Sequence, residues 1–190
     1  MNPEKKSCAW CEGNPLYQSY HDEEWGVPLY DEQRLFEFLT LETFQSGLSW
    51  ITILKKRENF RQAFDQFDYN KISAYDQTKV DLLLSDERIV RNRLKILATI
   101  NNAKCFIELR KTEESFSNFI WNYVNHQPIQ NSFELPNDIP SKTKLAEQIS
   151  KDLKKKGFKF IGPTVIYAHM QATGMVNDHL VTCFRHKELL

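Results

Sequence analysis

Apolar residues recur at helical spacing along almost the whole chain, and no stretch shows the strict alternation of a half-buried strand. In one example, Leu35 and Leu39 lie one turn apart and follow Asp31, a residue type that caps helix N-termini. The spacing therefore predicts an all-α bundle of roughly eight to ten short helices.

Residue types that favour helix ends divide this pattern into segments. Expected helix starts lie at Ser49, Thr78, Ser115 and Ser141. A longer helix is expected over 89–109, and a last one from near Asn177. Gly157 is expected to close a helix in the left-handed conformation, and Pro163 to open one that runs to 174. The polar stretch 125–144, with three prolines, is the only candidate linker.

The length of 190 residues predicts a single domain over 1–190. Neither an apolar run of the ~20 residues needed to span a bilayer nor a signal-peptide hydrophobic region is found in the sequence. We therefore expect a cytoplasmic monomer with no membrane partner. Because 25 basic residues balance 25 acidic ones, any nucleic-acid partner must be held by local clusters of charge.

Three basic clusters lie at 55–57, 91–95 and 151–159. Each alone is typical of a solvated helix face, but together they allow a surface that tracks phosphates. The last cluster leads into a hairpin at 157–164 between two expected helices. Backbone N–H groups at the start of the helix that Pro163 opens can bind a phosphate.

Cysteine and histidine residues lie near both ends of the chain. His179 and Cys183 are four apart, which on a helix places both on one face, where they can share a metal. Cys8, Cys11 and His21 lie at the other end. A tetrahedral zinc site with ligands from both ends would join the termini and add stability. The spacing alone is equally compatible with a buried Cys and His, and a redox role for the Cys8–Cys11 pair lacks a surrounding βαβ pattern.

Aromatic residues are concentrated in the first fifty residues: Trp10, Tyr17, Tyr20, Trp25, Phe44 and Trp50. Glu42 lies within this group. Composition alone favours an aromatic core with Glu42 at the surface. The functional alternative is a pocket in which aromatic faces sandwich a planar cationic group and Glu42 accepts its hydrogen bonds. Burial would raise the pKa of Glu42, so the carboxyl would need a donor partner.

Several long segments together are more specific than any one motif. They are CAW at 8–10, YHDEEWGVP at 20–28, GLSWITILKKR at 47–57, FIWNYVNH at 119–126, GFKFIGPT at 157–164 and VNDH at 176–179. Through these segments the chain resembles the DNA-3-methyladenine glycosylase I family of base-excision repair enzymes, over nearly its whole length. The resemblance implies a helical fold of the helix-hairpin-helix glycosylase superfamily.

The resemblance also implies an activity and a set of site residues. The activity is hydrolysis of the N-glycosidic bond of 3-methyladenine in double-stranded alkylated DNA, with release of the free base. The structural zinc falls on Cys8, His21, His179 and Cys183, with Cys11 as the alternative to Cys8. The base pocket falls on the catalytic Glu42 and on Trp10, Tyr17, Tyr20 and Trp50, with Trp25 nearby. The zinc ligands would join the N-terminal segment and the C-terminal helix into one lobe. The expected DNA contacts in the hairpin are Lys159, Gly162 and Thr164.

The chain departs from many members of that superfamily at three places. Asn177 stands where a catalytic Asp is common, and Pro163 and Thr164 stand where lyase members carry their nucleophilic Lys. We therefore expect a hydrolase without lyase activity that leaves an abasic site. Phe160 occupies a hairpin position where glycine is expected, so the grip on DNA is expected to differ.

Two other functions fit part of the pattern. A zinc-stabilised DNA-binding module without catalysis would use the basic clusters and the Cys/His set, but would have no need for a buried carboxylate among aromatic rings. A helical protein-interaction domain would have an aromatic core, no bound metal and no salt-dependent affinity for DNA.

Overall fold

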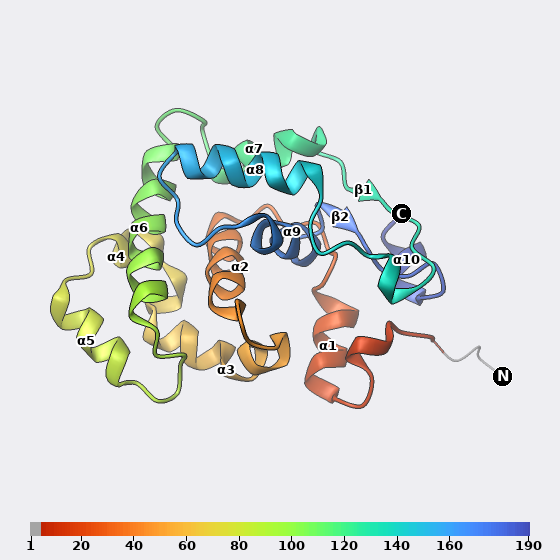
Figure 1. Cartoon of the computed structure of the whole chain (residues 1–190), viewed down its shortest axis with the longest axis horizontal. Coiled ribbons are helices and arrows are strands. Elements are labelled where there is room, and N and C mark those ends of the chain that lie inside the picture. Colours follow the sequence, from red (N-terminus) through yellow and green to blue (C-terminus); the bar gives the residue numbers. More distant parts are fainter. Residues whose placement is uncertain (1–4) are drawn as a thin grey trace.

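The computed structural model describes residues 5–190 and forms a helical bundle (Figure 1). The helices are α1 (Pro15–Glu23), α2 (Glu32–Gln45), α3 (Trp50–Ala63), α4 (Tyr69–Ser73), α5 (Gln77–Ser85), α6 (Arg93–Leu109), α7 (Phe116–Trp121), α8 (Lys144–Lys155), α9 (Pro163–Ala172) and α10 (Phe184–Glu188). Short 3-10 turns are η1 (Ala9–Cys11), η2 (Asp65–Phe67), η3 (Asn122–Val124) and η4 (Pro136–Asp138). The predicted all-α class is confirmed, while a single domain over 1–190 stays a prediction and includes residues 1–4, outside the described part.

Several predicted helix ends are confirmed by their hydrogen bonds and backbone angles. The Asp31 carboxylate accepts the backbone N–H of Arg34 at 2.9 Å, and the Ser115 hydroxyl caps α7 in the same way. Gly157 ends α8 with φ of +92°, and Pro163 occupies the first turn of α9. These residues act locally, which is why sequence alone was sufficient to find them.

Other predicted starts are displaced by a few residues toward a better capping side chain. Asp76, not Thr78, caps α5; the helix expected over 89–109 begins only after Asn92; and Thr143, not Ser141, caps α8. In each case an Asp, Asn or Thr oxygen accepts a backbone N–H of the first turn. Helix α1 was not predicted, although Asn14 followed by Pro15 is a typical start.

Helix α2 lies at the centre of the bundle, where it packs against α3, α6, α7 and α9 (Figure 1). Ten of its fourteen residues are buried, so it has almost no solvent face. Two of them are acidic, Glu37 and Glu42. Glu37 is neutralised by Arg57 of α3, whose Nε lies 2.7 Å from its carboxylate, and by Arg61. Glu42 has no ion pair among the described residues, in contrast to Glu37.

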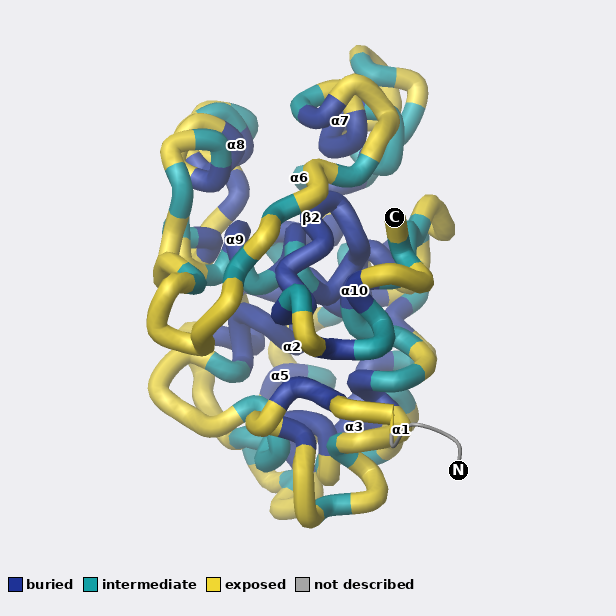
Figure 2. The backbone as a smooth tube through the Cα atoms, turned by 90° about the vertical axis from the view of Figure 1, so that its right-hand side faces the viewer, coloured by how far each residue is buried: buried dark blue, intermediate teal, exposed yellow. Residues whose placement is uncertain are grey.

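The C-terminal segment contradicts the prediction of a helix beginning near Asn177. Strand β2 (Val176–Asn177) instead pairs in parallel with β1 (Ile129–Gln130), and helix α10 begins only at Phe184. The Asn177 amide donates to the Gln130 side chain at 2.8 Å and to the His186 carbonyl at 3.0 Å, which holds the chain extended. Figure 2 shows β2 within the buried part of the molecule. The stretch 125–144 is therefore no linker, because it supplies β1.

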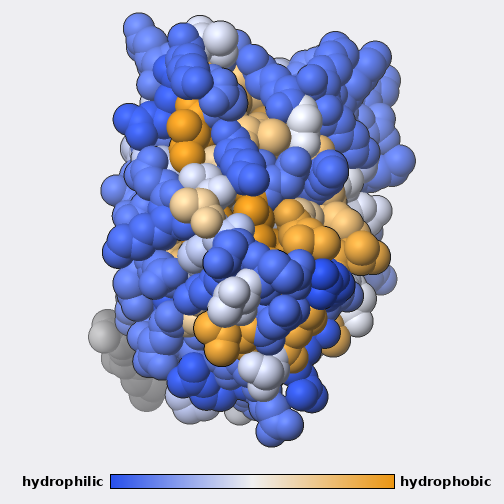
Figure 3. Space-filling view, turned by 90° about the vertical axis from the view of Figure 1, so that its left-hand side faces the viewer, coloured by the Kyte–Doolittle hydropathy of each residue, from blue (hydrophilic) through white to orange (hydrophobic). Residues whose placement is uncertain are grey.

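On the face that carries α4, α5 and α6, apolar side chains gather in a few groups among hydrophilic ones (Figure 3). The exposed apolar residues of these helices are Leu82, Leu94 and Leu97. Exposed apolar groups of this kind are ordinary on a protein surface. Within residues 5–190, every helix is too short or too polar to cross a bilayer.

Gly174 joins the N-terminal segment to the end of α9 by close backbone contact. Its φ is +72°, and a Cβ there would lie 2.4 Å from backbone atoms of Val27 and Pro28. The backbone N–H of Leu29 donates to the Thr173 carbonyl at 3.0 Å beside this contact. Only glycine fits this position, because both its conformation and its space exclude a side chain.

We therefore expect Gly174→Ala to lower the free energy of unfolding by more than about 3 kcal/mol, since strain and a backbone clash add together. Gly13→Ala is the matched control, because Gly13 has φ of +78° but open space around it. It should cost only about 1 kcal/mol, the strain alone. Urea denaturation of both variants measures the difference, and equal losses would contradict the close contact at Gly174.

Candidate metal centre and base cavity

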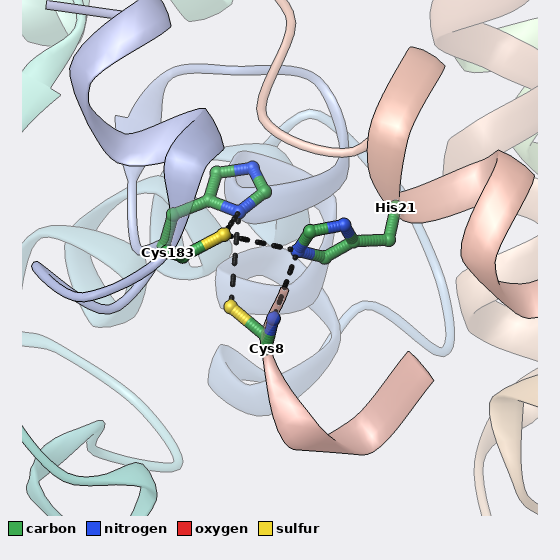
Figure 4. A group of neighbouring side chains, drawn as sticks. Cys8, His21 and Cys183 are labelled. Atoms are coloured by element: carbon green, nitrogen blue, oxygen red, sulfur yellow. Dashed lines mark hydrogen bonds between the residues drawn. The ribbon is translucent and has the colours of Figure 1, made fainter. Parts of the chain in front are cut away.

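Four side chains from the two ends of the chain converge on one point. The ligand atoms of Cys8, His21, His179 and Cys183 all lie within 4.8 Å of one another, and all four residues are buried. Cys183 Sγ is 3.4 Å from His21 Nε2 and 3.6 Å from His179 Nδ1. Figure 4 shows Cys8, His21 and Cys183 pointing toward one another. This Cys₂His₂ group is able to hold a metal ion and joins the N- and C-terminal segments.

The alternative ligand Cys11 lies outside this group. Its thiol donates to the backbone carbonyl of Cys8 at 3.0 Å. The structure therefore places Cys8, and not Cys11, among the four. His179 and Cys183 do meet as the four-residue spacing suggested, but they lie in the irregular segment before α10 and not on a helix.

Both imidazole rings are oriented by a second hydrogen bond on the side away from the thiols. His21 Nδ1 lies 2.6 Å from the Asp22 carboxylate, and His179 Nε2 lies 3.0 Å from the Trp25 carbonyl. Metal-binding histidines are commonly held in this way, which fixes the nitrogen that faces the ion. Gly26 makes room for the His179 ring, since a Cβ there would lie 3.0 Å from His179 Nε2.

The electrostatics of the cluster favour one thiolate even before an ion binds. Hydrogen bonding with the Cys8 thiol, and then with the His179 and His21 rings, lowers the pKa of Cys183. Thiolate sulfur and neutral imidazole nitrogen are the ligands that structural zinc sites use. The donor set and its burial therefore fit a closed tetrahedral site.

We expect Cys183→Ser to lose the bound metal and to lower the melting temperature by at least about 10 °C, because the ion would no longer join the chain ends. Cys11→Ser is the matched control, since it removes a buried neighbouring thiol that lies outside the cluster. Metal content per chain by mass spectrometry and thermal unfolding measure the two effects. Retention of a full equivalent of metal by the Cys183 variant would show that this cluster is not the site.

A cavity of about 160 Å³ lies beside the metal centre. Its walls come from five elements, η1, α1, α2, α3 and α9, and from the turn after α1. The lining residues are Trp10, Tyr17, Tyr20, Trp25, Glu42, Gln45, Trp50, Ala168 and Gln171. The structure thus brings together every residue predicted for the pocket, including Trp25.

Aromatic rings form most of this wall. The Tyr20 and Trp50 ring centroids are 5.4 Å apart, and Trp10 lies 4.8 Å from Tyr17 and 5.2 Å from Trp25. The indole N–H of Trp50 is buried and has no hydrogen-bond partner in the part of the chain described. A buried donor without a partner is costly in a folded protein.

Glu42 lies in the cavity wall and is only 5% exposed. The composition-based interpretation of a surface Glu42 is therefore wrong. Burial raises the pKa of its carboxyl to about 8. The predicted need for a donor partner is unmet within residues 5–190, so the cavity holds an acid that a bound cation would stabilise in its charged form.

The cavity wall also contains three residues that the sequence analysis missed. Ala168 and Gln171 lie one turn apart on α9, and Gln45 lies one turn after Glu42 on α2. The Gln45 amide donates to the Leu48 carbonyl at 3.0 Å, and the Gln171 amide donates to Asp178 at 2.8 Å. The only available signal was the helical spacing after the hairpin, which does not say what the face of α9 meets.

The hairpin between α8 and α9 is anchored to α6. The Asn102 side chain accepts the backbone N–H of Lys159 at 2.8 Å and donates to its carbonyl at 2.9 Å. Lys159 and Thr164 are exposed, and Gly162 is half-buried. Phe160 adopts φ of +56° and is 45% exposed, so it takes the left-handed conformation in which glycine was expected. The hairpin is thus an outward-facing segment anchored to α6 by hydrogen bonds.

The raised pKa of Glu42 predicts how stability depends on pH. Between about pH 5 and pH 8 the native state holds a proton that the unfolded state has lost, so stability falls as pH rises through this range. The slope from this one group approaches about 1.4 kcal/mol per pH unit. Glu42→Gln should remove it and leave the variant more stable than the wild type at pH 8. Urea denaturation across this pH range measures the difference, and parallel profiles would exclude a raised pKa.

The helical frame, with its outward-facing hairpin and aromatic cavity, has the architecture of a helical DNA glycosylase. A family model described as methyladenine glycosylase matches residues 10–186. The chain therefore belongs to the methyladenine glycosylase family.

Individual relatives are similar to this chain over almost its full length. DNA-3-methyladenine glycosylase 1 of Escherichia coli (strain K12) is 48% identical over 176 residues, which cover 93% of this chain and 94% of that protein. A crystal structure of 3-methyladenine DNA glycosylase I superposes with a TM-score of 0.92 at 46% identity, covering 94% of this chain and 98% of that one. A variant of such an enzyme in complex with 3-methyladenine superposes with a TM-score of 0.90 at 39% identity, covering 94% and 96%.

Proposed function

We propose that this protein removes 3-methyladenine from double-stranded alkylated DNA by hydrolysing its N-glycosidic bond, which releases the free base and leaves an abasic site. The observation that carries this proposal is the buried, unpaired Glu42 in an aromatic cavity of about 160 Å³. The names of the relatives and the 3-methyladenine complex of one of them support the same activity.

The cavity suits a planar cation better than a neutral base. Methylation at N3 gives adenine a positive charge while it is attached to the sugar. The Glu42 carboxylate and the aromatic faces of Trp50 and Tyr20 both attract such a charge. Burial raises the pKa of Glu42 to about 8 and so favours its protonated form. A bound cation acts in the opposite direction and favours the ionised carboxylate. Unmodified adenine would leave the carboxyl without that compensation and would bind weakly.

Few groups are needed for the bond cleavage itself. The damaged nucleotide leaves the duplex and enters the cavity, where Trp50 stacks on the base and Tyr20 and Glu42 hydrogen-bond its edge. The bond between the sugar carbon and the base nitrogen breaks, and its electron pair neutralises the charge on the base. Water then bonds to the sugar carbon and loses a proton to solvent. DNA phosphates and cavity dipoles stabilise the intermediate cation of the sugar.

The remaining parts of the proposal concern the ion, the DNA and the state of the protein. We assign zinc to the Cys₂His₂ cluster, as a structural ion, because its closed set of four ligands leaves no position for substrate. Lys159, Gly162 and Thr164 of the hairpin are the proposed DNA contacts, with the first turn of α9 facing a phosphate. Since no Lys follows Gly162, we propose a monofunctional hydrolase without lyase activity. A cytoplasmic monomer remains part of this proposal.

We expect Glu42→Gln to lower kcat/KM for release of 3-methyladenine from methylated DNA about 10- to 100-fold, the value of one charge-assisted hydrogen bond. Trp50→Ala should act similarly and should also weaken binding of the free base. Glu58→Gln is a control, since Glu58 is an exposed residue on the same helix as Trp50. Chromatography of the released bases measures the rates.

Two results of this experiment would reject parts of the proposal. Affinity for 3-methyladenine that is unchanged in both cavity variants would remove the pocket assignment. DNA binding by the wild type with no base released would favour the alternative of a DNA-binding module without catalysis.

A further inference from the structure

Gln171 is a cavity residue whose side-chain amide is held by a buried carboxylate outside the cavity, that of Asp178. It lies on the same face of α9 as Ala168, whose small side chain leaves the glutamine open to the cavity. Its amide nitrogen donates to Asp178 Oδ2 at 2.8 Å. Asp178 is 1% exposed and does not line the cavity, so its contact with the cavity is made through Gln171.

Three donors converge on Asp178. Besides Gln171, the Tyr167 hydroxyl donates to Oδ2 at 2.5 Å and the Asn131 amide donates to Oδ1 at 2.7 Å. Because a carboxylate accepts hydrogen bonds and cannot donate them, Gln171 must turn its nitrogen toward Asp178. Its carbonyl oxygen then lies on the other side of the amide and has no donor among residues 5–190.

We propose that the carbonyl oxygen of Gln171 accepts a hydrogen bond from the amino group at C6 of the flipped base and so selects methylated adenine over methylated guanine. This inference rests on the proposed function. Adenine carries an amino group at C6, and its two N–H bonds can serve Glu42 and Gln171 together. Guanine carries a carbonyl oxygen there, which would face two acceptors and leave them unpaired. A site built to hydrogen-bond one group rejects a base that lacks it.

Asp178 and Asn131 are then positioning residues. The Asn131 amide donates to Oδ1 of Asp178, so Oδ2 faces Gln171 and accepts its N–H. This contact prevents the Gln171 amide from turning over. With its amide reversed, Gln171 would present an N–H to the cavity and would donate a hydrogen bond to the guanine carbonyl. The polarity of the cavity thus depends on a hydrogen-bond chain that begins outside it, beside strand β1.

Gln171→Met tests the proposed contact, since methionine keeps the shape of the side chain and removes both polar atoms. We expect kcat/KM for 3-methyladenine to fall about tenfold while that for 3-methylguanine does not fall, so that their ratio drops at least tenfold. DNA methylated at both bases supplies the substrates, and chromatography separates the released bases. Gln148→Met is the matched control, because Gln148 and Tyr123 meet Asp152 in the same way on another helix. It should leave the ratio unchanged.

Asp178→Asn tests the positioning role, because its amide allows Gln171 to turn over and should lower the same ratio. Adding Asn131→Asp to Asp178→Asn exchanges donor and acceptor within the pair and should restore the wild-type ratio. A purely structural role would alter stability and rates but would not produce this rescue.

The outcomes separate this inference from the proposed function. A wild type that releases no 3-methyladenine would overturn the proposed function. A wild type that releases it, with an unchanged ratio in Gln171→Met or in Asp178→Asn, would overturn the role of Gln171. A lowered ratio in both single variants, restored in the double variant, is the result we expect.

Discussion

The Cys₂His₂ cluster is the interaction on which the cavity depends, because it ties the walls of the cavity together. Cys8 lies two residues before Trp10, and His21 directly follows Tyr20. The other two ligands follow Asp178, which holds Gln171 in place. Besides the cluster, an ion pair between Glu24 and Arg57 and a group of aromatic contacts hold the end of α1 to the bundle. An ion bound by the cluster would therefore stabilise the shape of the cavity while lying outside it.

Glu42 has the opposite effect on stability, because its burial destabilises the fold. An unpaired acid in the central helix α2 costs free energy, as its raised pKa of about 8 records. Glu37, on the same helix, is a buried acid whose charge is compensated by ion pairs with Arg57 and Arg61. The contrast between two buried acids on one helix supports the functional role proposed for Glu42.

The sequence predicted those features that depend on residues close together in the chain, and it did not predict those that depend on residues far apart. Helical periodicity and the caps at Asp31 and Ser115 act within one turn, so the helices were largely predictable. The ligand set and the aromatic pocket came from resemblance over long segments, since spacing alone left a surface Glu42 and a spare Cys11 open. Gln171 and the pairing of β1 with β2 depend on contacts about fifty residues apart or more, and no local pattern records them.

Helix α9 connects the proposed DNA contacts to the cavity within one continuous element. Its first turn follows the hairpin, which Asn102 anchors, and Gln171 lies near its other end, where Gly174 packs against the N-terminal segment. Ten helical residues span about 15 Å, and both ends are fixed by contacts to other elements. The separation between a bound phosphate and the cavity is therefore set by the protein. In the proposed reaction the DNA must change shape to meet that separation, and the damaged nucleotide rotates out of the duplex to reach the cavity.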